Sequence, residues 1–264
     1  MKKLNSEGIC LFCKKSFKKS GMTRHLNTHL AEKEKIGKPG ISFHLKVEQS
    51  PRWGVAPWFL NLWVDGETQM GDIDEFLREI WLECCGHMSS FRPVGPRPPG
   101  GMFDFFEAEK LLEQGKTEEY EQLMEATSDE IPKSRAAKAA LKPDMKIEYQ
   151  YDFGSTTELL ITIAGVFSCA APNEIVLLSR NEPLAIMCEV CNAESARTIC
   201  MVCGSDGEPS LFCKSCGQKH KKTCEDYADY AQMPVVNSPR MGVCAYEGGY
   251  IDKGRDGIFK PKSE

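Results

Sequence analysis

The chain has 264 residues, of which 41% are hydrophobic and 27% charged, and its net charge is −5, a balance typical of a globular protein. Two lysines near the N-terminus are followed by no apolar run, and no stretch approaches the roughly 18 apolar residues of a membrane span. We therefore expect a soluble, cytoplasmic protein without a secretory signal or a membrane anchor.

The first element is a compact group of cysteines and histidines in "ICLFCKKSFKKSGMTRHLNTHL", residues 9–30. The spacing C-x2-C-x11-H-x3-H resembles the zinc finger of the two-Cys, two-His (C2H2) type, with one residue fewer between the pairs than usual. Phe17 and Met22 stand where that family places its core residues. The two histidines share one face of a helix because they are four residues apart. The sequence predicts a finger over residues 1–35 that binds zinc through Cys10, Cys13, His25 and His29.

The N-terminal arm is basic, whereas the rest of the chain is acidic. Residues 1–46 contain eleven Lys/Arg and three Glu, a charge of +8, so the remainder carries −13. Such an arm suits a polyanion. The resemblance to C2H2 fingers implies that the helix faces bases with Lys18, Gly21 and Arg24. We take Lys18, Lys19 and Arg24 as candidate nucleic-acid contacts, of DNA or RNA. A single finger reads only about three base pairs, so we expect non-specific or weakly specific binding. A protein-docking finger and a purely structural clip remain the alternatives.

The central segment, residues 41–183, follows a charged linker at 32–40 and mixes strand and helix patterns. "ISFHLKVE" and "PWFLNLWVDG" alternate or run apolar like strands, whereas "DIDEFLREIWLECCG" changes to helical spacing. Asp72 with Glu75 predicts the start of that helix, and Gly86 its end. We expect His44 to be a satisfied side chain of its strand.

Irregular structure is expected over "RPVGPRPPGG" (92–101), and helices from Asp104 to about Leu141. Residues 104–130 contain ten acids and two lysines, which favours a solvated helical face over an acidic docking surface. "KIEYQYDFG", "ELLITIAGVFS" and "EIVLLSR" close the segment as strands. The fold class is α+β. We expect the tryptophans to build its core; they are Trp53, Trp58, Trp63 and Trp81.

A second cysteine-rich segment, residues 184–230, has the spacing C-x2-C-x8-C-x2-C-x9-C-x2-C-x3-H-x3-C. Eight such ligands complete two tetrahedral zinc sites, which are closed and therefore structural. Pairing in sequential order and pairing in crossed order, with the first and third cysteine pairs on one ion, are both possible. The order resembles MYND and B-box-type zinc modules, which implies a protein partner. The predicted ligands are Cys188, Cys191, Cys200, Cys203, Cys213, Cys216, His220 and Cys224. The tail, residues 231–264, should be extended and pack back on the body or on this module.

The central segment also resembles a known family. Gly86-His87 with Phe91, and then Tyr149 to Gly154 within "KIEYQYDFG", are similar to motifs of the plasmid pRiA4b ORF-3-like family, over about residues 41–180. The resemblance implies an α+β body and a link to mobile elements. The chain departs from the family pattern after Gly154, where Ser155 to Glu158 stand.

We therefore expect a non-enzymatic zinc protein with three ions that contacts nucleic acid through the finger and a protein through the C-terminal module. The alternative is a metal-independent enzyme with an acid/base pair formed by His87 and Asp152. The remaining cysteines lack ligand spacing, and we expect them to pack as buried side chains; they are Cys84, Cys85, Cys169 and Cys244.

Overall fold

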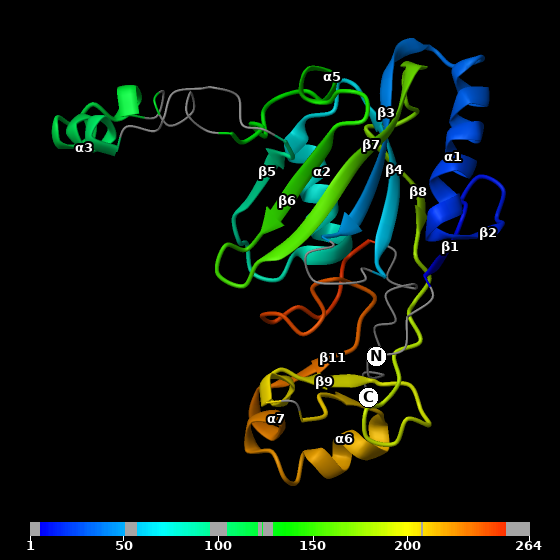
Figure 1. Cartoon of the computed structure of the whole chain (residues 1–264), viewed down its shortest axis with the longest axis vertical. Coiled ribbons are helices and arrows are strands. Elements are labelled where there is room, and N and C mark those ends of the chain that lie inside the picture. The colour runs from blue at the N-terminus through cyan, green and yellow to red at the C-terminus, as the bar shows by residue number, and fades with distance from the viewer. Residues whose placement is uncertain are drawn as a thin grey trace.

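A six-stranded antiparallel sheet forms the body of the protein (Figure 1). The structure is a computed structural model that describes residues 6–50, 57–95, 105–120, 123, 129–206 and 208–251. The strands lie in the order β5 (Ser89–Pro93), β6 (Lys146–Tyr151), β7 (Thr157–Cys169), β3 (Pro39–Gln49), β4 (Phe59–Asp65) and β8 (Ile175–Arg180). Helices and this sheet together confirm the α+β class.

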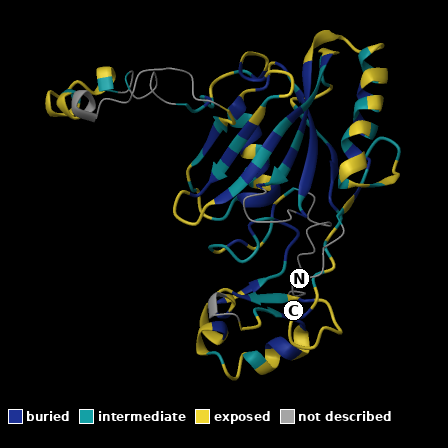
Figure 2. Ribbon diagram, in the orientation of Figure 1, coloured by how far each residue is buried: buried dark blue, intermediate teal, exposed yellow. Residues whose placement is uncertain are grey.

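The sheet is buried on both faces at its centre, which Figure 2 shows as dark blue strands. Along β4, Leu60, Leu62 and Val64 contribute to one apolar core, whereas Phe59 and Trp63 contribute to another. Successive side chains of a strand point to opposite faces, so the two cores lie on opposite sides of the sheet. One is shared with α2 (Met70–Leu77), and the other with α1 (Lys19–Glu34).

The finger is part of the body and shares its second core. Met22, Leu26 and Leu30 of α1 are fully buried against this face of the sheet. The hairpin of β1 (Glu7–Ile9) and β2 (Ser16–Lys18) lies along β8, where a Cβ on Gly8 would come 2.5 Å from the carbonyl oxygen of Arg180. The finger helix therefore covers the sheet, and the expected linker shrinks to the residues between Glu34 and Pro39.

A buried polar contact ties α1 to the sheet. Asn27 Nδ2 donates to the carbonyl oxygen of Ala164 at 2.8 Å, which leaves its Oδ1 facing His44 Nδ1 at 2.5 Å. The other ring nitrogen of His44 lies 2.9 Å from Asn61 Oδ1. Burial lowers the pKa of His44 to about 4, so the ring is neutral at pH 7. A neutral ring has a single N–H, so it donates to one of these two amide oxygens, and His44 is buried as a side chain of its strand.

The α2 helix starts earlier than its sequence indicates and ends in a wide turn. Gln69 N–H donates to Asp72 Oδ2 at 2.8 Å, so Asp72 lies inside the first turn and Gln69 precedes the helix. The prediction that Asp72 caps the helix was therefore wrong, because the capping residue is Gln69, three residues earlier. A π-helix over Arg78–Leu82 follows α2, and Gly86, with φ of 77°, turns the chain toward β5.

The insertion between β5 and β6 contains α3 (Phe105–Glu113) and α5 (Ala137–Ala140). Side chains of α3 from Glu109 to Glu113 are exposed or half-buried, in line with a solvated face. Trp63 and Trp81 are buried and Trp58 packs against the core, whereas Trp53 and Asp104 lie outside the described residues. None of the described helices combines the length and apolar character needed to span a membrane.

The C-terminal module is built on a small sheet below the body (Figure 1). Strand β9 (Thr198–Cys200) pairs with β10 (Leu211–Phe212) and β11 (Gln232–Pro234). The turn Cys203–Asp206 and the helices α6 (Lys214–His220) and α7 (Glu225–Asp229) complete it.

The tail after β11 returns to the body. Asn181 Nδ2 donates to Asn237 Oδ1 at 2.6 Å, and Asn237 Nδ2 donates to the carbonyl oxygen of Asn181 at 3.1 Å. The described part of the tail therefore packs on the module and the body; residues 252–264 lie outside the description.

One buried carboxylate connects α2 with the motif strands β5 and β6. Asp74 Oδ1 accepts hydrogen bonds from Ser89 Oγ at 2.6 Å and Tyr149 OH at 2.7 Å, and its Oδ2 accepts from Arg78 and Lys133 at 3.0 and 2.9 Å. Burial raises the pKa of Asp74, but these donors outweigh it and lower the pKa below the ordinary value. The ionised form therefore stabilises the folded state.

We predict that Asp74→Asn lowers the free energy of unfolding by roughly 2 to 3 kcal/mol, because charge-assisted hydrogen bonds are lost. The folded pKa of Asp74 lies below its unfolded value, so its contribution is present above the unfolded pKa and disappears as the pH falls through the folded pKa. Urea unfolding at pH 7 and at lower pH measures this. The difference from wild type should shrink in acid.

The matched control is Asp144→Asn. Asp144 is exposed and has φ of 58°, a conformation that asparagine also adopts. If both variants unfold at the same urea concentration as the wild type, the network does not stabilise the body.

Candidate metal centres

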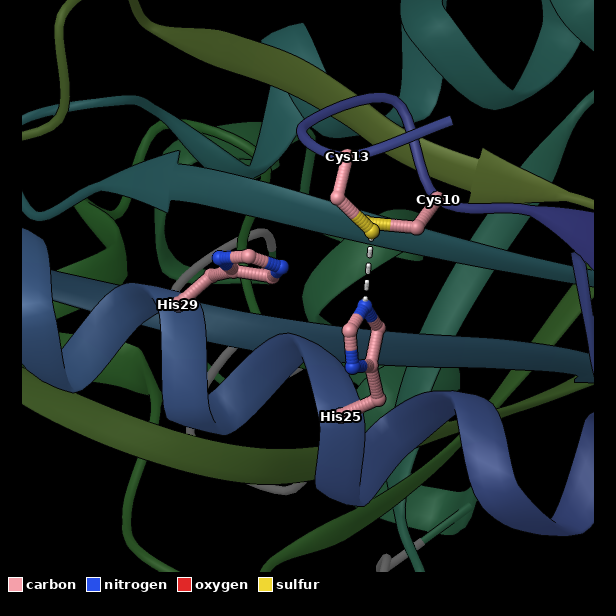
Figure 3. Close-up of side chains that lie close together, drawn as sticks. All are labelled: Cys10, Cys13, His25 and His29. Carbon is pink, nitrogen blue, oxygen red and sulfur yellow. Dashed lines mark hydrogen bonds between the residues drawn. The ribbon is translucent and has the colours of Figure 1, made fainter. Parts of the chain in front are cut away.

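The four finger residues converge on one point between the β-hairpin and α1 (Figure 3). Cys10 and Cys13 lie in the turn of the hairpin, where Lys14 N–H donates to the carbonyl oxygen of Cys10 at 2.8 Å. His25 and His29 project from successive turns of α1 toward these sulfurs, and Cys13 Sγ lies 3.2 Å from His25 Nε2. All four ligand atoms lie within 4.8 Å of one another.

The surroundings of the finger residues fit a bound ion. His29 Nε2 is buried and has no hydrogen-bond partner among the residues that the structure describes. A buried nitrogen without a partner is costly unless it binds something else. Phe17 stacks on the His25 ring, with 3.9 Å between the ring centroids, and holds its orientation. The chain thus supplies two sulfurs and two nitrogens, a donor set that zinc accepts.

In the C-terminal module the eight ligands form two sets in crossed order. The first and third cysteine pairs meet in one set, in which Cys191 Sγ and Cys213 Sγ lie 3.8 Å apart. An ion about 2.3 Å from each sulfur in a tetrahedron separates two sulfurs by about 3.8 Å. The structure therefore groups these ligands in the crossed order and not sequentially: Cys188, Cys191, Cys213 and Cys216.

The second set takes its ligands from β9, the turn Cys203–Asp206, α6 and the residue before α7. Cys203 Sγ lies 3.4 Å from His220 Nε2 and 3.9 Å from Cys224 Sγ, again close to tetrahedral spacing. Phe212 stacks on His220, with 4.2 Å between the ring centroids, and Tyr227 lies edge-on to both rings. The members are Cys200, Cys203, His220 and Cys224.

The acidity of these thiols shows why the module suits a cation. Burial raises the pKa of Cys188, but backbone N–H groups donate to its sulfur and lower the pKa to about 6; the same balance lowers the pKa of Cys200. Burial and neighbouring thiols raise the pKa of Cys216 and Cys203 to about 12. In each set the pKa of one thiol is therefore lowered, whereas that of another is raised by burial and by its crowded neighbours. A divalent ion would supply positive charge that favours the thiolate form of both.

The candidate nucleic-acid residues lie on the outer side of the finger, with one difference among them. Lys18, Gly21 and Arg24 are exposed. Lys19 instead binds Glu48 of β3 at 2.6 Å, and its side chain is 26% exposed. That ion pair ties the start of α1 to the sheet, so a phosphate would have to compete with Glu48 for Lys19.

His87 and Asp152 are brought together, but each has other partners. His87 Nε2 lies 3.5 Å from Asp152 Oδ2, which also accepts a hydrogen bond from the buried Arg240 at 2.7 Å. Burial raises the pKa of Asp152, but Arg240 and two backbone N–H groups outweigh it and lower the pKa to about 2. Asp152 is therefore an ionised partner of Arg240, which makes it a weak proton acceptor at neutral pH.

A further Cys/His group was not found from the sequence. Cys84, Cys85, His87 and Cys244 have ligand atoms within 4.8 Å of one another. The expectation that these cysteines are buried was wrong for Cys84 and Cys244, which are half-buried, and for Cys85, which is exposed; it holds for Cys169. The sequence does contain C-C-x-H at the end of a helix, which could have indicated metal ligands. The fourth ligand, Cys244, is 159 residues from Cys85, so spacing along the chain could not reveal the group.

No family model matches this sequence, and no curated protein matches it. Among solved structures, a protein of unknown function from Methanosarcina mazei Go1 is 14% identical, over 56% of this chain and 73% of its own, with a TM-score of 0.36. Such a likeness carries no argument about function. What the described residues establish is four Cys/His groups that could each hold a metal ion, with donor sets compatible with zinc.

Proposed function

We propose that this is a non-enzymatic zinc protein that contacts nucleic acid through the outer face of its finger helix. Zinc bound in the finger and in the two ligand sets of the C-terminal module holds the finger and the module in their folded shapes. The observation that carries the proposal is the division of α1 into two faces. Met22, Leu26 and Leu30 are buried against the sheet, whereas Gly21 and Arg24 are exposed on the same helix and Lys18 is exposed directly before it.

The charge around this face supports contact with phosphates. Lys14, Lys15 and Lys18 precede or start the finger helix and are exposed, as is Arg24. Gly21 has no atom within 4 Å of the position of a Cβ, so a backbone or base could approach the helix closely there. A face of this size offers few contacts, and phosphate charge would dominate the affinity.

We predict that the double variant Lys18→Ala/Arg24→Ala binds nucleic acid more weakly than the wild type. The slope of log Kobs against log salt concentration should become shallower by about 2, one unit per lost phosphate contact. Fluorescence anisotropy with a labelled duplex DNA and a labelled single-stranded RNA, each across a salt series, measures this and tells the two nucleic acids apart. Lys19 stays unchanged because of its ion pair with Glu48.

The matched control, Lys142→Ala/Lys146→Ala, removes the same charge from exposed positions on the body. It should bind as the wild type does. The proposal fails if the finger variant, with its zinc content intact, keeps the wild-type slope and affinity.

A protein partner for the C-terminal module is the second proposal, and it comes from exposed apolar side chains at the metal turns. Val190 lies between the first two ligands of one set and is 56% exposed; Val202 lies between the first two of the other and is 37% exposed. Met187 and Met201 are exposed beside them. Apolar side chains on a small rigid module suit an apolar protein surface.

We predict that Val190→Ser/Val202→Ser loses partners that the wild-type chain retains when it is cross-linked in extracts of its own cells. Quantitative mass spectrometry of the captured proteins measures this, together with zinc content to show that the module is folded. Val94→Ser is the control, because Val94 is 49% exposed on the body. If the wild type, the Val190→Ser/Val202→Ser variant and the Val94→Ser control capture the same proteins in equal amounts, the module has no docking role.

For the body, we infer kinship with the pRiA4b ORF-3-like family. Its motif residues are partners in the fold: Phe91 of β5 stands opposite Tyr149 of β6, and their rings lie 4.8 Å apart. Tyr149 in turn binds Asp74. These contacts are structural, so they explain why proteins of one fold would share these residues. They give the body no activity. We therefore do not favour the acid/base alternative at His87 and Asp152.

A further inference from the structure

The Cys/His group at the end of the π-helix has the spacing of a tetrahedral metal site. Cys85 Sγ lies 3.7 Å from Cys84 Sγ and 3.5 Å from Cys244 Sγ, and Cys244 Sγ lies 3.6 Å from His87 Nε2. A zinc ion separates two sulfurs by about 3.8 Å, and a sulfur from a nitrogen by about 3.5 Å. The contact between Cys85 Sγ and His87 Nε2 is shorter, at 2.9 Å.

The backbone around the group adopts conformations that aim these side chains at one point. Gly86, between Cys85 and His87, has φ of 77°, and its N–H donates to Glu83 Oε1 at 2.6 Å. Cys244 has φ of 54°, which is unfavourable for a residue with a side chain. Such strain persists only where the surroundings impose it, and a ligand position would give it a reason.

The charge beside the group also fits. Three thiolates and one divalent ion leave a net charge of −1. Arg240 is fully buried, and its Nη2 lies 3.5 Å from Cys84 Sγ. The same guanidinium binds Asp152 Oδ2 at 2.7 Å and lies over the ring of Tyr151, so it is fixed in place. Asp152 balances the charge of Arg240, so what Arg240 supplies to Cys84 is a fixed N–H donor, as an outer partner of a metal ligand does.

The C-terminal tail is anchored on both sides of Cys244. A π-helix leaves backbone carbonyls without their usual partners. Ser238 Oγ donates to the carbonyl oxygen of Trp81 at 2.7 Å, and Tyr250 N–H donates to that of Glu79 at 2.6 Å. A Cβ on Gly249 would come 2.3 Å from the carbonyl oxygen of Ile80, so only glycine allows this approach. The tail therefore lies directly on the π-helix, and Cys244 falls between its two anchors.

We propose that Cys84, Cys85, His87 and Cys244 bind a fourth zinc ion, which fastens the C-terminal tail to the body. The donor set of three sulfurs and one nitrogen suits zinc and disfavours calcium or magnesium, which prefer oxygen. All four positions are filled by the protein, so the ion is structural and has no place for a reacting water. It cross-links residues that are 159 positions apart.

The site explains features that the other zinc sets leave without a role. A cysteine that is exposed, as Cys85 is, suits neither packing nor a stable free thiol. A disulfide between Cys85 and Cys244 would use two of the four residues and leave His87 and Cys84 unexplained. The metal accounts for all four together.

The test is the zinc content of the full-length protein purified under reducing conditions, measured by elemental mass spectrometry and by native mass spectrometry. The wild type should contain four zinc ions per chain, and Cys85→Ser should contain three. Because Cys85 is exposed, this change leaves the packing of the body intact. Cys169→Ala is the matched control, since Cys169 is buried outside the metal groups and should retain four ions.

A second readout tests the role of the ion. In Cys85→Ser, hydrogen exchange at the tail amides of Val243 and Tyr246 should become severalfold faster, while amides of β3 and β7 keep their protection.

Three outcomes overturn the proposal. The first is a wild type with three ions and freely reactive Cys84, Cys85 and Cys244. The second is iron at this group. The third is a Cys85–Cys244 disulfide, found by peptide mapping of protein whose free thiols were alkylated at cell lysis before any reduction. If Cys85→Ser fails to fold, Cys244→Ser replaces it under the same criteria.

Discussion

The C-terminal module depends on bringing eight cysteine and histidine side chains together in two groups that could each hold a metal ion. The buried cluster of its core is five cysteines with Phe212, Tyr227 and Ala231, and Ala196 and Met233 of the module are also buried. So few apolar side chains cannot offset the chain entropy of a segment of this length. Burial and crowding by neighbouring thiols also raise the pKa of Cys216 in one set and of Cys203 in the other. A metal ion in each set would remove that effect and supply folding free energy directly.

The finger has the same kind of ligands as the module, but it does not depend on them alone, because its helix also packs on the sheet of the body. The apolar face of α1 is buried in a core shared with Phe59, Trp63 and Phe167 of the sheet. Lys19 and Asn27 add polar contacts to β3 and β7. The finger therefore stands at a fixed angle to the body, and its outer face has a fixed direction. A partner would meet this face as part of a larger rigid surface.

Sequence spacing predicted the ligands that are close along the chain, and much less of what joins distant segments. The pairs around Cys10 and Cys188 follow from a tight turn that aims two sulfurs together. The strands around His44 follow from alternation. The order of the six strands, the docking of α1 and the role of Arg240 depend on side chains that meet only in the folded protein. Cys244 is the clearest case, because its position beside Cys85 is set by the π-helix and the tail together.

The central claim is that metal ions, more than apolar packing, hold the C-terminal module in shape. Hydrogen exchange measured by mass spectrometry, before and after removal of zinc from the reduced full-length protein, tests it most directly. We expect residues 188–231 to lose their protection when zinc is removed, while β3 and β7 in the body keep theirs. Full protection of this segment in a chain shown to contain no zinc would contradict it.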